Sequence, residues 1–113
     1  MSAIFAAALP VLPGQTERVR NFAAEVDVHR ETYDELNRSA TLSRHLVFLQ
    51  AGPDGDQAIH VMEGEDLSRI AREFTGSPHD EWWLDFLRDV HGIDLRGGDA
   101  PGGGQLVFDS SPG

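Results

Sequence analysis

Two histidines on neighbouring predicted strands are the first candidates for chemistry. His45 lies in a predicted strand over 44–51 and His60 in a second over 57–63. Histidine titrates near neutral pH without help from its surroundings. If the strand register points both rings to one side, they could act as an acid–base pair, or bind a metal ion together with Glu63. Otherwise, one ring faces solvent and the other is a hydrogen-bonded residue of the core or of an interface.

A third histidine, His79, lies in the first turn of a predicted helix over 78–91. Ser77 suits the N-cap of that helix and Pro78 suits its first position. The positive end of a helix attracts anions and lowers the pKa of a nearby histidine. His79 could therefore be a base beside a ligand carboxylate or phenolate. The alternative is that Asp80 and Ser77 form a helix cap and His79 faces water.

The end of the same helix carries a fourth histidine. His91 lies in its last turn, where a cation interacts favourably with the helix dipole, so we expect it to cap the helix. Gly92 suits the left-handed position that follows, and Ile93 suits the hydrophobic contact that closes such a cap.

Four aromatic residues are candidates for binding an apolar ligand. Trp82 and Trp83 are about 100° apart on the helix, so they cannot both face the core. Trp83 belongs to the apolar stripe, whereas Trp82 lies on a flank and could line a pocket or cover the rim of an interface. Tyr33 lies on the apolar stripe of a predicted helix over 15–40 and reaches either a cleft or the core. Phe48, in the second strand, could line or fill the same cleft.

The predicted elements alternate in the order β-α-β-β-α-β. They are strands over 4–12, 44–51, 57–63 and 105–109, one long helix over 15–40 with a bend near 26–28, and a two-part helical segment over 66–75 and 78–91. This order predicts an α+β, ferredoxin-like domain over 1–113, with a four-stranded antiparallel sheet and helices on one face. The loop over 52–56 is too long to fix the register of the hairpin. We expect a flexible loop over 96–104 and a tail over 110–113.

Apolar residues occupy both faces of the predicted strands. Leu46 and Phe48 alternate with Val47 and Leu49, so neither face of that strand is polar. Since the helices cover one face only, a monomer would expose an apolar sheet. We therefore expect two sheets to pack face to face in a homodimer.

Composition excludes several classes of protein. The chain has 113 residues and a net charge of −10, which disfavours binding to nucleic acid or to an anionic membrane. It has no cysteine, hence no disulfide and no thiolate metal site, which fits a cytoplasmic location. The apolar N-terminus lacks a basic region and is too short to span a bilayer. The acidic residues over 27–35 read as a solvated helix face.

Two segments carry a resemblance to a known family. They are 13–19 (PGQTERV), where a first strand ends and a helix begins, and 74–80 (FTGSPHD), followed by Trp83. With the element order, they resemble the dimeric α+β barrel superfamily, and more narrowly its small uncharacterised bacterial members. The resemblance implies two ferredoxin-like protomers with joined sheets and a cleft in each. The superfamily includes monooxygenases, haem-degrading enzymes, polyketide cyclases and isomerases. The Asn-Trp-His set of the first two has no match here, so no catalytic residue is carried over.

Two hypotheses about function follow. The first is a small enzyme, independent of metal or cofactor, that uses His60, His45 and His79 for acid–base chemistry on an apolar, aromatic or polyketide-like molecule. Proton abstraction next to a carbonyl suits such groups, leading to cyclisation, isomerisation or oxygenation. The second is a non-catalytic homodimer that binds a ligand or has a structural role. A cavity lined by histidine would favour the first hypothesis, and a cleft filled by aromatic side chains the second.

Overall fold

In the part of the chain that the structure describes, a three-stranded antiparallel sheet is combined with five helices. We analysed a computed structural model, which describes residues 3–76, 81–99 and 102–111. The strands are β1 (Ala3–Pro10), β2 (Leu42–Gly52) and β3 (Gly55–Gly64), in the sheet order β1-β3-β2. The helices are α1 (Thr16–Arg20), α2 (Phe22–Val28), α3 (Arg30–Ser39), α4 (Leu67–Gly76) and α5 (Glu81–His91). The predicted α+β class is confirmed.

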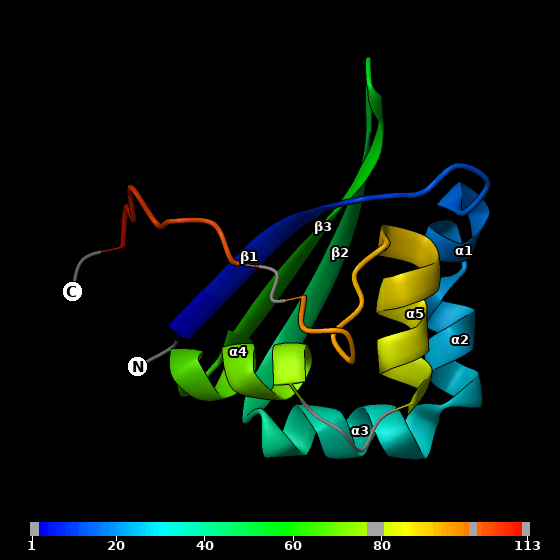
Figure 1. Cartoon of the computed structure of the whole chain (residues 1–113). Coiled ribbons are helices and arrows are strands. Elements are labelled where there is room, and N and C mark those ends of the chain that lie inside the picture. The colour runs from blue at the N-terminus through cyan, green and yellow to red at the C-terminus, as the bar shows by residue number, and fades with distance from the viewer. Residues whose placement is uncertain (1–2, 77–80, 100–101, 112–113) are drawn as a thin grey trace.

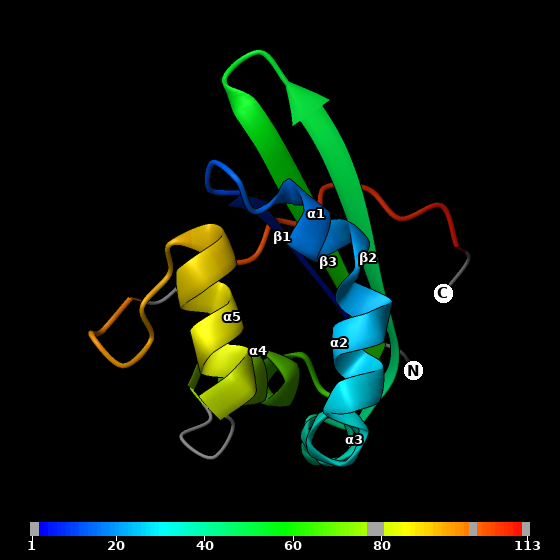
Figure 2. The same cartoon turned by 90° about the vertical axis from the view of Figure 1, so that its right-hand side faces the viewer.

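The helices lie on one face of the sheet (Figures 1 and 2). α5 stands beside α1 and α2, while α3 and α4 lie near one end of the sheet. On β3 the side chains alternate: Ala58, His60 and Met62 are buried toward the helices, and Ile59 and Val61 are only half-buried on the other face. A period of two is the signature of a sheet whose faces meet different surroundings. Within the described part of the chain, no helix is long and apolar enough to cross a membrane.

The long first helix is broken twice. Instead of one helix over 15–40, α1, α2 and α3 are separated at Asn21 and His29, whose ψ angles of 17° and 32° leave the α-helical region. The predicted bend near 26–28 therefore falls at His29. After this break α3 turns across the end of the sheet (Figure 1). The change of direction lets Phe22 and Val26 of α2 and Tyr33 of α3 all reach the same core.

The hairpin turn is shorter than the sequence suggests. Gly52 pairs with Gly55, so only Pro53 and Asp54 form the loop between β2 and β3. A two-residue loop fixes the register of a hairpin, which corrects the expectation that this loop leaves the register open. An irregularity in the pairing occurs between Leu42 and Arg44, away from the turn.

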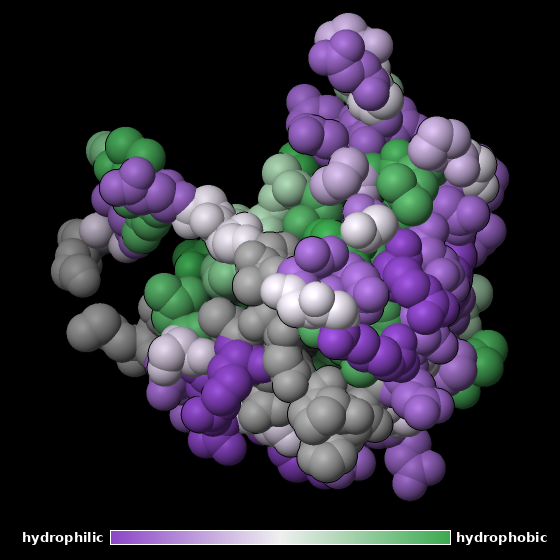
Figure 3. Space-filling model, in the orientation of Figure 1, coloured by the Kyte–Doolittle hydropathy of each residue, from purple (hydrophilic) through white to green (hydrophobic). Residues whose placement is uncertain are grey.

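The predicted fourth strand over 105–109 is not confirmed. Residues 102–110 carry neither helix nor strand, and Leu106, Val107 and Phe108 are exposed. The chain touches the sheet where the Gly104 N–H donates to the Ala6 carbonyl of β1, and then leaves it (Figure 1). A strand needs a continuing ladder of such bonds. Figure 3 shows hydrophobic residues on this projecting segment and on the adjacent part of the body.

The end of α5 is formed as its sequence predicts. Gly92 adopts a left-handed conformation with φ of 70°, and its N–H donates to the Arg88 carbonyl. Ile93 packs against the core, completing the cap. The predicted start of this helix, at 77–80, lies outside the described residues.

Candidate functional site

The hairpin register places His45 and His60 on the same face of the sheet. His60 lies opposite Val47, and His45 lies opposite Met62, so the two histidines are diagonal neighbours on β2 and β3. Both rings point toward the helices because both occupy the buried parity of their strands. His91, the last residue of α5, approaches from the helical layer. The Nε2 atoms of His60 and His91 are 3.3 Å apart.

The three histidines belong to one hydrogen-bonded row. The Tyr33 hydroxyl lies 2.7 Å from Nδ1 of His45, and Nε2 of His45 lies 3.1 Å from Nδ1 of His60. After the His60–His91 contact, Nδ1 of His91 lies 2.7 Å from the carbonyl oxygen of Pro10. We call Tyr33, His45, His60, His91 and the Pro10 carbonyl the histidine chain. It links α3, both strands of the hairpin, α5 and the end of β1.

Burial keeps the imidazoles of the histidine chain uncharged at neutral pH. His60 and His91 are each 2% exposed, while His45 is half-buried. Desolvation lowers the pKa of His45 to about 4. Desolvation, with repulsion from His45 and His91, lowers the pKa of His60 to about 3. The pKa of His91 is lowered by burial, against an opposing effect of its bond to Pro10.

Burial also raises the pKa of the Tyr33 hydroxyl, so Tyr33 keeps its proton at neutral pH. An Asn37 side chain on the next turn of α3 acts in the opposite direction. The Oδ1 atom of Asn37 is buried and has no hydrogen-bond partner among the described residues.

Aromatic rings surround the histidine chain. Phe22 makes edge-to-face contacts with both His45 and His60, with ring centroids 5.8 and 6.4 Å apart. Trp83 does the same at 6.3 and 6.0 Å, and is itself buried. Such contacts put the positive edge of one ring against the face of another. The rings therefore form an apolar wall around the histidines.

Trp82 flanks this wall and is held from two sides. Its ring stacks on Phe22 at 6.1 Å and on His29 at 4.9 Å. Its Nε1–H donates to Glu25, which also forms an ion pair with Arg18 at 2.8 Å. Burial acts to raise the pKa of Glu25, but the bonds from Arg18 and Trp82 outweigh it and lower the pKa. Trp82 is half-buried, and its contacts with Phe22, His29 and Glu25 hold the ring in one orientation.

The structure brings together part of the predicted site. His45, His60, Tyr33 and Trp83 lie in one cluster, with Trp82 at its edge. Phe48, 53% exposed, lies on the opposite face of the sheet, because it has the other parity of β2. His79 lies outside the described residues.

Sequence reasoning missed His91 as a site residue and named Glu63 only as one possible metal partner, without predicting a metal site. The ring of His91 enters the core instead of capping the helix, and its position four residues after the core residue Leu87 carried a signal for the inward face. Glu63 is on the far side of the sheet from His60. Among the residues that the structure describes, no group of three or more histidines and carboxylates is placed to hold a metal ion.

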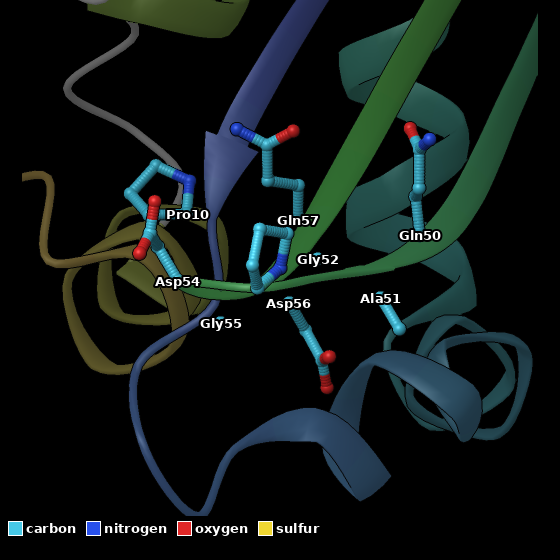
Figure 4. Close-up of a pocket in the computed structure, with 9 residues that line it drawn as sticks. Pro10, Gln50, Ala51, Gly52, Asp54, Gly55, Asp56 and Gln57 are labelled. Carbon is cyan, nitrogen blue, oxygen red and sulfur yellow. The ribbon is translucent and has the colours of Figure 1, made fainter.

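Two surface hollows lie away from the histidine chain. One, of about 380 Å³, is formed by Pro10 and the tip of the hairpin over 50–57 (Figure 4). Its Asp56 points toward α1 and accepts a hydrogen bond of 2.7 Å from Thr16. A smaller one, of about 60 Å³, lies on the uncovered sheet face, between Ile4 and Arg44. Neither is lined by histidine.

No family model and no curated protein matches the chain.

Proposed function

We propose that this protein is a small enzyme, independent of metal or cofactor, in which Tyr33 and His45 perform acid–base chemistry. The observation that carries the proposal is the 2.7 Å contact between the Tyr33 hydroxyl and Nδ1 of His45, backed by two further histidines. A hydroxyl with an imidazole in hydrogen-bond contact is the arrangement that general acid–base catalysis requires. His45 is the half-buried histidine of the row, so substrate meets the row at this end.

The surroundings of this pair suit an apolar substrate. Phe22 and Trp83 pack edge-to-face against His45, and Trp82 stacks on Phe22, so an aromatic environment surrounds this end of the row and favours a flat aromatic or polyketide-like molecule. An uncharged base in apolar surroundings can remove a proton next to a carbonyl without first losing a hydration shell. Cyclisation, isomerisation and oxygenation of the resulting carbanion all begin with this step.

We also propose that the chain belongs to the superfamily that its sequence resembles. In a split β-α-β arrangement β3 lies between β1 and β2, as it does here. The segment over 105–109 would complete a ferredoxin-like sheet by pairing with the free edge of β1, where Gly104 already donates to Ala6. These features support membership of the dimeric α+β barrel superfamily.

The proposal also includes a homodimer through the uncovered sheet face, in the cytoplasm. Ile4 and Phe48 are 49% and 53% exposed there, and Leu46, Ile59 and Val61 are half-buried between them. A contiguous apolar face of this kind marks an interaction site in a protein that stays in solution. Since the face is a sheet, a second copy offers a surface of the same shape.

The enzymatic proposal is tested by proton exchange at carbon. Acetophenone, an aryl methyl ketone, is incubated with the protein in D₂O, and loss of the methyl proton signal is followed by NMR. We expect the wild-type protein to accelerate exchange, and Tyr33→Phe and His45→Gln to reduce the acceleration about 100-fold. Glu31→Gln, an exposed amide substitution on the same helix as Tyr33, should leave it unchanged.

A non-catalytic homodimer is the second candidate. It is favoured by the fact that both ring nitrogens of His60 and His91 are bonded within the protein, as in a core network that specifies a fold. It is also favoured by the packing of Phe22 and Trp83 around the row and by the absence of histidine from the two hollows described above. Under this reading acetophenone is not exchanged faster than in buffer, while the loss of either histidine lowers stability.

A further inference from the structure

The histidine chain ends at a group that can only accept. The Pro10 carbonyl has no proton to give, so Nδ1 of His91 must carry the hydrogen of their 2.7 Å contact. A neutral imidazole has one N–H, and burial keeps His91 neutral. Its Nε2 is therefore an acceptor.

This one assignment fixes every other proton in the row. Because Nε2 of His91 accepts, Nε2 of His60 must donate across the 3.3 Å contact, and Nδ1 of His60 must accept. Nε2 of His45 then donates across 3.1 Å, and Nδ1 of His45 accepts from the Tyr33 hydroxyl. All donors point from α3 toward the end of β1, and no site in the row is left without a partner.

From this order we infer that the histidine chain moves a proton from Tyr33 to His91, and that His60 and His91 are positioning residues for the proposed chemistry. The inference rests on the proposed function for its catalytic consequence, whereas the order of the protons stands without it.

The transfer balances at every atom. The Tyr33 oxygen takes a proton from the substrate carbon as its own proton passes to Nδ1 of His45. The Nε2 proton of His45 passes to Nδ1 of His60, and the Nε2 proton of His60 passes to Nε2 of His91. The substrate becomes a carbanion, Tyr33 and two histidines remain neutral, and His91 becomes an imidazolium. Every hydrogen bond within the row is kept, with the Tyr33–His45 bond and both His–His bonds reversed and the His91–Pro10 bond unchanged.

His91 is the member of the row best placed to hold a positive charge. It is the last residue of α5, where the helix dipole is negative, and Pro10 gives its Nδ1–H a carbonyl acceptor. His60 lies between two other imidazoles, which oppose its protonation. The charge therefore passes through His60 and rests at the far end, away from the reacting carbon. The reverse transfer returns the proton to the product.

The order of the protons is tested by NMR of protein labelled with ¹⁵N in histidine. At pH 7 we expect the Nδ1–H tautomer at His91 and the Nε2–H tautomer at His45 and His60. An Nδ1–H tautomer at His45 or His60 in the free protein would overturn the inference. This measurement needs no substrate, so it tests the order of the protons even if the protein does not catalyse the proposed reaction.

The destination of the proton is tested with His91→Gln. The glutamine amide can donate to Pro10 and accept from His60, so it preserves the hydrogen bonds but cannot take up a proton. We expect the tautomers of His45 and His60 to be unchanged while acetophenone exchange falls about 100-fold. Exchange within about two-fold of wild type, with the tautomers kept, would overturn the inference and leave the proposed function standing. If the wild-type protein does not accelerate acetophenone exchange, the proposed function is wrong. The order of the protons in the histidine chain is then tested by the tautomers alone.

Discussion

Nε2 of His45 lies 3.1 Å from Nδ1 of His60, although the two residues are not directly paired across the hairpin. They are diagonal neighbours, since His60 is opposite Val47 and His45 is opposite Met62. Diagonal neighbours on one face are within reach of long or aromatic side chains. The turn at Pro53 and Asp54 sets this register, and through it the candidate site.

Replacing Tyr33 should destabilise the protein through His45. Tyr33→Phe removes the hydroxyl that donates to Nδ1 of His45 and leaves that nitrogen without this partner. A polar group that loses its partner in a protected position costs about 1 to 3 kcal/mol. Urea unfolding at pH 7 measures the change, with Glu31→Gln on the same helix as the control. Equal unfolding free energies for Tyr33→Phe and wild type would contradict the hydrogen bond.

Stability should fall when the pH drops from 7 to 5. In the unfolded chain histidine titrates near its ordinary pKa of 6.5, whereas the folded pKa values of His45 and His60 are about 4 and about 3. The unfolded state therefore binds more protons in this window, and stability is lost as the pH falls. The loss should reach about 2 to 4 kcal/mol by pH 5.

Urea unfolding at pH 7, 6 and 5 measures this loss. His45→Gln removes one of the histidines whose folded pKa is lowered, so its loss over the same range should be clearly smaller than that of wild type. A stability that stays flat from pH 7 to 5 would show that the two histidines titrate alike in the folded and unfolded states.

Trp82 and Trp83 should differ in how much they contribute to the free energy of unfolding. Trp83 is 2% exposed and packs on Phe86, His45 and His60, so Trp83→Ala should cost about 3 to 5 kcal/mol. Trp82 is half-buried, so Trp82→Ala should cost clearly less. Trp82→Phe keeps a ring between Phe22 and His29 and loses only the bond to Glu25. Thermal unfolding of the three variants ranks their stabilities. A Trp82→Ala variant that is less stable than Trp83→Ala would contradict this prediction.

If the proposed dimer forms through the uncovered sheet face, a charge placed on that face should disrupt it, whereas a charge placed on the helical layer should not. Phe48→Asp and Ile4→Asp each place a carboxylate on the uncovered sheet face and should convert a dimer to a monomer. Val28→Asp is the matched control, because Val28 is 80% exposed on the helical layer. Light scattering coupled to size exclusion gives the mass of each variant. A wild-type mass equal to one protomer would refute the dimer.

Local signals predicted much of the fold. The apolar stripe of α5 and Gly92 placed the end of that helix, and the turn residues over 52–56 placed β2 and β3 on either side of them. The break at Asn21 was not predicted, since no glycine or proline marks it, whereas the break at His29 was expected as a bend near 26–28. The change of direction of α3 after His29 was not predictable, because it depends on packing against the end of the sheet (Figure 1).

The site was only partly predictable for a similar reason. His45 and His60 could be chosen by residue type, but their meeting depends on a register that a short turn decides. His91 appeared to be a cap, because a histidine in the last turn of a helix favours one. Only the packing of α5 against β1 shows that its ring reaches Pro10 and His60.

The imidazoles of His45, His60 and His91 form one row of N–H···N bonds. Scalar couplings between nitrogens across such bonds, recorded on protein labelled with ¹⁵N in histidine, test it directly. We expect one coupling between Nε2 of His45 and Nδ1 of His60, and a second between the Nε2 atoms of His60 and His91. Absence of both couplings, together with ring nitrogens that titrate near the ordinary histidine pKa, would contradict the account.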